Sequence, residues 1–204
     1  MIKLFHYVIN NYKSRNKNNS VHLVFDHMFS NDNYTVFMIT MKIGKQVIPL
    51  WFRCFKGNSC SDAFQEELIK EGINYVSNLF TSEDKLIFLA DRWLNSISLL
   101  QHIDSLGHTY CIRAKSNIKT FYFDKKQGHK FWTQLGYLQS YYKHSNLFYN
   151  IEITENRYSV NLVISKRKGV TEPWIIITNG EPKRAIKDYG YRFGNWIWFQ
   201  KSKI

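Results

Sequence analysis

The chain has 204 residues, and its 28 lysines and arginines against 16 aspartates and glutamates give a formal charge of +12. Hydrophobic residues make up 44% and aromatic residues 17%, which excludes a disordered basic tail and predicts a sizeable packed core. We expect one domain whose charge favours a polyanionic partner, nucleic acid first and an anionic membrane surface second. A basic protein without such a partner is the alternative.

Cysteine usage and the N-terminus favour a cytoplasmic protein without a membrane partner. The three cysteines (Cys54, Cys60 and Cys111) are odd in number and form no C-x-x-C pair, which argues against a disulfide framework. Met1 to Asn11 lacks the continuous apolar stretch of a signal peptide. No apolar run in the chain is long enough to span a membrane.

The first half of the chain changes from strand patterns to helical spacing. Residues 10–20 are polar and basic and resemble a linker. Three β-patterned runs separated by turn residues predict an antiparallel meander, with Pro49 placing the third run at an edge because proline cannot donate to a ladder. Two helices alternating with two apolar strands then predict a parallel, buried half. The expected elements are strands 21–28, 34–41 and 46–53, helix 61–80, strand 85–90, helix 93–106 ended by Gly107, and strand 109–114.

The second half begins with an aromatic and basic segment that we interpret as a β-rich insertion at about 119–171. Within it, residues 147–164 alternate in period two, which predicts a hairpin. An apolar strand at 174–178 and a helix at 181–203 follow. The fold class is therefore α/β with a mixed sheet: βββαβαβ, the insertion, one strand and a C-terminal helix.

Two aspartates stand out by their positions. Asp26 lies inside or at the end of the first strand, and Asp91 directly follows the fourth. A parallel crossover can place these two strands side by side, which would bring both carboxylates together. Carboxylates at adjoining strand ends suit Mg²⁺, and two-metal sites of this kind act on phosphodiesters. Capping of a loop or strand end is the alternative for each aspartate.

At these residues the sequence resembles the DDE transposases of bacterial insertion sequences, in the group with a Tyr-Arg-Glu-Lys signature. VHLVFDHMFS matches the first acid (Asp26), and KLIFLADRWLNSISLLQHIDSLGHTYCIRAKSN matches the second (Asp91, followed by Arg92). EPWIIITN resembles the strand before the last helix, and YGYRFG matches Tyr-x-x-Arg through Tyr189 and Arg192. The resemblance covers roughly residues 5–195 and implies an RNase H-like mixed sheet.

The resemblance implies DNA transposition and recombination by a mobile element. By this resemblance, the catalytic and metal-binding residues of the chain are Asp26 and Asp91, and the expected cofactor is Mg²⁺ or Mn²⁺. Tyr189, Arg192 and Lys203 would bind DNA phosphates. The partners are transposon ends and target DNA, an intact member could form a homodimer, and the location is bacterial, cytoplasmic and nucleoid-associated. The basic aromatic insertion could also lie on DNA through Lys125, Lys126, Lys130, Trp132, Lys143, Lys166, Arg167 and Lys168.

Two departures from the family suggest a chain truncated at both ends. Only residues 1–25 precede Asp26, so we assign 1–20 to a linker or remnant of the family's N-terminal DNA-binding region and 21–204 to one catalytic domain. The position of the family's catalytic Glu falls on Trp196 or Ile197, and no acid follows Asp188. We therefore expect an inactive or impaired transposase fragment, with a frameshift near codons 194–198 as a hypothesis for its ending. The alternatives are a DNA-binding remnant that does not cut and an RNase H-like nuclease.

Overall fold

The computed structural model describes residues 7, 9, 11, 20–30, 34–43, 46–56, 62–92, 96–124, 128–138, 146–165 and 172–201, with the backbone alone at 29–30, 62–63, 124 and 194–201. No helix in this part of the chain is both long and apolar enough to cross a membrane. Its elements, in chain order, are β1 (Ser20–Ser30), β2 (Tyr34–Ile43), β3 (Gln46–Lys56), α2 (Asp62–Ser77), β4 (Lys85–Ala90), α3 (Ile97–Ser105), β5 (Thr109–Arg113), β6 (Lys119–Asp124), β7 (His129–Gln134), α4 (Leu135–Leu138), β8 (Asn146–Ile153), β9 (Tyr158–Ser165), β10 (Trp174–Thr178) and α5 (Pro182–Lys201).

The first five strands form a mixed sheet with two intervening helices, the βββαβαβ pattern that the sequence predicts. Their order is β3-β2-β1-β4-β5. β1 pairs antiparallel with β2, and β2 with β3, while β1, β4 and β5 are parallel. The predicted edge position of β3 is confirmed, and Pro49 lies opposite Thr40, where the register shifts by a bulge. The parallel crossover from β1 to β4 places these two strands side by side. The predicted meeting of the two acids depends on this arrangement.

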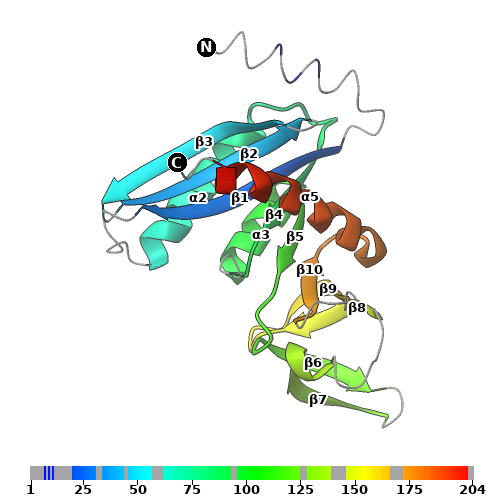
Figure 1. Cartoon of the computed structure of the whole chain (residues 1–204). Coiled ribbons are helices and arrows are strands. Elements are labelled where there is room, and N and C mark those ends of the chain that lie inside the picture. The colour runs from blue at the N-terminus through cyan, green and yellow to red at the C-terminus, as the bar shows by residue number, and fades with distance from the viewer. Residues whose placement is uncertain are drawn as a thin grey trace.

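The insertion continues the main sheet. β10 pairs antiparallel with β5 on one side and with β9 on the other, and β9, β8, β6 and β7 follow outward (Figure 1). The predicted hairpin is β8–β9, and its residues Val160, Leu162 and Ile164 are buried in the main core. β10 therefore connects the insertion directly to the strands that carry the acids.

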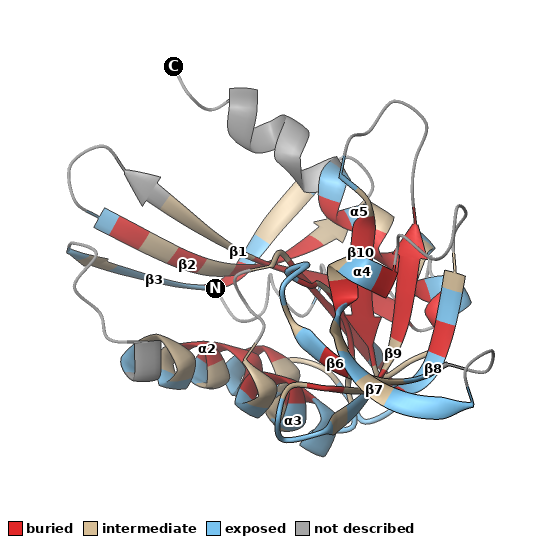
Figure 2. Cartoon of the chain, turned by 90° about the horizontal axis from the view of Figure 1, so that it is seen from below, coloured by how far each residue is buried: buried red, intermediate tan, exposed pale blue. Residues whose placement is uncertain are grey.

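Helices cover both faces of this sheet (Figure 2). α2 and α3 pack on one face over the larger apolar core, which also takes in Ile9 from the predicted N-terminal linker. α5 lies on the opposite face, where Ala185 and Tyr189 pack with Val24 and Leu89. The predicted end of α3 is also confirmed, because Gly107 has a φ of 73°, the left-handed conformation that glycine adopts at low cost.

α2 and β3 approach each other closely at Gly72. A Cβ added at Gly72 would stand 2.7 Å from the buried ring of Trp51. Glycine is therefore required at this point of α2 by packing, although it is a poor helix former.

We predict that Gly72→Ala lowers the free energy of unfolding by about 1–3 kcal/mol, because the added methyl group overpacks the contact with Trp51. Urea unfolding measures the change. Gly190→Ala is the matched control, since no described atom lies within 4 Å of its added Cβ, and it should stabilise by up to about 1 kcal/mol through helix propensity. Equal effects of the two substitutions would contradict the close approach.

Candidate active site

The register of β1 and β4 explains how Asp26 and Asp91 meet. The last paired residues of the two strands are Val24 and Leu89, and both belong to the core beneath α5. Side chains alternate between the faces of a strand, so Asp26 and Asp91, two residues further on, return to that same face. The two acids thus lie side by side just beyond the paired part of β1 and β4, Asp26 within β1 and Asp91 directly after β4, on the side that α5 covers.

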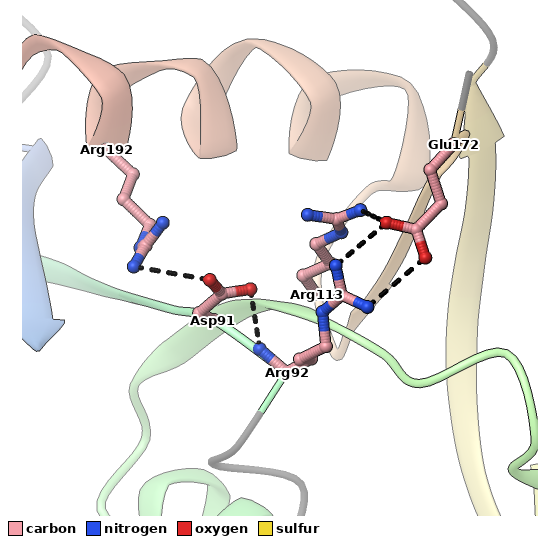
Figure 3. Close-up of polar contacts among 5 residues, drawn as sticks. All are labelled: Asp91, Arg92, Arg113, Glu172 and Arg192. Carbon is pink, nitrogen blue, oxygen red and sulfur yellow. Dashed lines mark hydrogen bonds and ion pairs between the residues drawn. The ribbon is translucent and has the colours of Figure 1, made fainter. Parts of the chain in front are cut away.

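Arg192 of α5 forms an ion pair with both acids. One of its terminal nitrogens lies 3.5 Å from Asp26 Oδ1 and 3.6 Å from Asp91 Oδ2. The side chain of Arg192 is 4% exposed, against 16% for Asp26 and 28% for Asp91. Figure 3 shows Arg192 reaching down from the helix toward Asp91. One buried guanidinium therefore stands between two carboxylates and is shared by them.

The backbone next to each acid orients its carboxylate. The backbone N–H of His27 donates to Asp26 Oδ1 at 3.0 Å, and the N–H of Arg92 donates to Asp91 Oδ1 at 2.8 Å. Each bond joins neighbouring residues, so it restricts the carboxylate without the help of a distant element. Both acids keep a defined orientation toward Arg192 for this reason.

Burial dominates the electrostatics of Asp26. Loss of solvent raises the pKa of Asp26, while the charge of Arg192 and the His27 N–H bond act in the opposite direction. Burial likewise lowers the pKa of His27, and it raises the pKa of Tyr189 to about 12. His27 and Tyr189 are therefore neutral at physiological pH, and Arg192 is the cation that forms ion pairs with both acids.

A second set of polar contacts holds α5 over β1. His22 Nε2 lies 2.8 Å from Asp188 Oδ1 in a buried pair, and the His22 ring stacks on Tyr191 with centroids 4.2 Å apart. Asp188 also pairs with Arg184 one turn earlier at 3.2 Å. Asp188 precedes Arg192 by one turn, so the contact that fixes Asp188 on β1 also determines where Arg192 points.

Beside the acid pair, two arginines share one glutamate (Figure 3). Arg92 donates from both terminal nitrogens to Glu172, at 3.2 Å to Oε1 and 2.8 Å to Oε2, and Arg113 donates to Oε2 at 2.6 Å. Sequence reasoning missed Glu172 and Arg113. A signal was present, because Glu172 is the single acid between Glu155 and Glu181 and follows a basic stretch.

The remaining predicted DNA contacts fall in different places. The Tyr189 ring is buried against Trp174, with centroids 5.2 Å apart. Within the described residues, the Tyr189 hydroxyl and Arg192 Nε have no hydrogen-bond partner although both are buried beside the acids. Lys203 lies outside the described residues. Contact with DNA by these three residues stays a prediction.

The insertion presents an aromatic hollow of about 470 Å³ between β6 and β8, whose wall includes Phe121, Lys130 and Tyr149. Lys130 Nζ stands 5.4 Å from the centre of the Phe121 ring, and Trp132 packs on that ring at 5.1 Å. Tyr149 and Trp132 are exposed. Of the predicted basic residues here, Lys125, Lys126, Lys143, Lys166, Arg167 and Lys168 lie outside the described part of the chain.

The donor chemistry of the acid pair suits a hard divalent cation, although the described residues do not complete a metal centre. Asp26 and Asp91 supply carboxylate oxygens, the ligands that Mg²⁺ and Mn²⁺ prefer, and Mg²⁺ often takes only one or two carboxylates and keeps water. Among the described residues, no group of three or more His, Cys, Asp or Glu side chains could hold a metal. The pair therefore fits one ion that competes with Arg192 for the same two carboxylates.

Several solved structures are similar to this chain. One is endonuclease V of Ciona intestinalis, in complex with a 24mer DNA containing an inosine followed by a ribo-adenosine. The two sequences are 15% identical, and the match covers 84% of this chain and 75% of the endonuclease V chain, with a TM-score of 0.43. A variant of the same enzyme with a 23mer DNA is 16% identical to this chain. That match covers 82% of this chain and 74% of the variant, with a TM-score of 0.46.

A third structure is Argonaute of Marinitoga piezophila, in complex with 5′ OH guide RNA and target DNA. The two sequences are 12% identical, and the match covers 91% of this chain and 28% of the Argonaute chain, with a TM-score of 0.35. No protein-family model matches the chain, and no curated protein matches it significantly. Its function therefore has to follow from its own site.

We predict that Arg192→Gln lowers the free energy of unfolding by about 3 kcal/mol at neutral pH, because the buried acid pair loses its shared cation. The loss should shrink as the pH falls to about 4, since burial raises the pKa of Asp26 and its protonation removes one of the two charges. Urea unfolding at both pH values measures this.

The control is Arg53→Gln, whose partner Glu71 is as exposed as Arg53 itself. It should cost less than about 1 kcal/mol at either pH. A loss for Arg192→Gln that does not depend on pH would show that the residue acts through packing alone.

Proposed function

We propose that this chain is a transposase-type protein of DNA transposition, with an RNase H-like core that binds the DNA backbone at Asp26, Asp91 and Arg192. The observation that carries the proposal is the meeting of these three side chains just beyond the point where β1 and β4 stop pairing. Oxygen ligands and a guanidinium at one point are the groups that a phosphodiester with its metal ion requires. The net charge of +12 supports a polyanionic partner.

In this proposal, Asp26 and Asp91 would hold Mg²⁺ or Mn²⁺. When bound, the ion supplies charge stabilisation and an activated oxygen nucleophile for attack on a DNA phosphodiester. Arg192 offsets one of the two carboxylate charges in the DNA-free protein. Its guanidinium would turn to a phosphate oxygen when DNA arrives, which leaves the two carboxylates to the metal ion.

The ion pair of the acids with Arg192 favours a second candidate, a domain that binds DNA without cutting it. Arg192 already offsets one of the two carboxylate charges, and α5 carries no acid after Asp188 to serve as a third ligand. Loss of a carboxylate from a two-metal site removes much of the charge stabilisation on which cleavage depends. An RNase H-like nuclease would need that same ligand.

We predict salt-sensitive binding to DNA. The dissociation constant for a short duplex of mixed sequence should rise steeply with salt, because each neutralised phosphate contributes about 0.9 to the slope of log K against log salt. Fluorescence anisotropy over a salt series measures the slope. Binding that is absent, or independent of salt, would remove both candidates.

Because α5 carries no acid after Asp188 to serve as a third ligand, the non-cutting candidate predicts strand cleavage at or near background in Mg²⁺ or Mn²⁺. A nicking assay on supercoiled plasmid tests this, with Asp26→Asn as the control for contaminating nuclease. Activity that Asp26→Asn abolishes would contradict the non-cutting candidate and show that two acids suffice for catalysis.

A further inference from the structure

We propose that Arg92 and Arg113 form a binding site for a backbone phosphate of DNA, which Glu172 occupies in the DNA-free protein. This inference rests on the proposed function and adds a second contact point beside the acid pair. The three residues come from the loop after β4, from the end of β5 and from the segment that enters β10.

The geometry around Glu172 is that of an anion held by two arginines. Arg92 makes a forked contact with both carboxylate oxygens, and Arg113 adds a third hydrogen bond to Oε2. The hydrogen bonds from Arg92 keep the pKa of Glu172 below its usual range, so the group is ionised at neutral pH. Two positive charges therefore face one negative charge, which leaves the cluster with an excess of +1.

A phosphodiester can replace this carboxylate with little change in the arginines. It presents two non-bridging oxygens and one negative charge, and forked guanidinium contacts serve carboxylates and phosphates alike. Both kinds of anion can therefore use the donors that Arg92 and Arg113 already point at Glu172.

The cluster is open to solvent, as a site for DNA must be. The side chain of Glu172 is 54% exposed and that of Arg92 42%, while Arg113 at 16% forms the rigid base. An incoming phosphate takes over the same arginine donors, so displacing Glu172 leaves neither arginine without an anion. Trp174, two residues on, is buried against Tyr189, so the chain after Glu172 is anchored and only the side chain needs to turn away.

The position of the cluster suits a strand that also reaches the acids. Arg92 follows Asp91 in the chain and donates its backbone N–H to that carboxylate. Figure 3 shows Arg192 and Asp91 on one side of Arg92 and Arg113 with Glu172 on the other. A DNA strand can therefore place one phosphate at the acid pair and another of its phosphates at the two arginines.

The test compares Glu172→Gln with Glu71→Gln in binding to a short duplex of mixed sequence. Both substitutions change the net charge by the same amount, and both remove a glutamate that pairs with arginine, since Glu71 pairs with Arg53. Glu172→Gln should tighten binding by about three- to tenfold because it removes the internal competitor, while Glu71→Gln should change it less than about twofold.

Arginine variants complete the cycle. Arg92→Gln and Arg113→Gln should each weaken binding and reduce the salt slope by about 1. In a protein that carries both arginine substitutions, Glu172→Gln should no longer tighten binding. Urea unfolding of each variant verifies that the fold is intact.

Equal effects of Glu172→Gln and Glu71→Gln would overturn the phosphate site and leave the proposed function standing. A gain that persists without both arginines would also overturn it, because the gain would then be a general charge effect. Absence of DNA binding by the wild-type protein would remove the proposed function itself.

Discussion

The shared ion pair of Arg192 with Asp26 and Asp91 is the constraint on which the rest of this molecule depends. Two largely buried carboxylates on neighbouring strands repel each other and lose hydration, so one of them would take up a proton if no cation were close. Arg192 removes that cost only if α5 crosses the sheet at the correct place. The position of the last helix is therefore an electrostatic requirement of the acid pair as well as a matter of apolar packing.

The contacts of α5 meet this requirement at successive turns. Arg184, Asp188 and Arg192 follow one another at intervals of four residues, and each makes a polar contact with β1. Between them, Ala185 and Tyr189 bury the apolar side of the helix on β1 and β4. Apolar packing supplies the attraction to the sheet, and the polar contacts select one register because each unpaired buried charge would be costly.

The two arginine–carboxylate clusters have opposite composition. In the first, one arginine serves two acids, and in the second, two arginines serve Glu172. Together they contain three positive and three negative side chains, so these six residues balance in charge, while the whole chain carries +12. One divalent metal ion at the first cluster would add two positive charges. One phosphate at each cluster would add two negative charges, so the six residues with their ligands would still balance.

Local pattern determined most of the fold. β-Branched and aromatic runs, a helical period at α2 and Gly107 at the end of α3 are properties of neighbouring residues, so the meander, the parallel half and the β8–β9 hairpin could be predicted. The pairing of Asp26 with Asp91 was also predictable, because parallel strands bring their carboxyl ends to one edge. The path of β10 between β5 and β9 was not, since a short apolar strand carries no sign of its neighbours.

The sequence by itself thus determined that Asp26 and Asp91 lie close together. The tertiary structure decided that Arg192 is the partner of both acids. The Tyr189-x-x-Arg192 spacing places two side chains on one helix face, but the burial of Arg192 against the acids depends on where α5 crosses β1 and β4. Glu172 reaches Arg92 across 80 residues and Arg113 across 59, and no local period encodes such a contact. Charges separated this far along the chain find each other only after the sheet has formed, because its strand order sets the distances at which they interact.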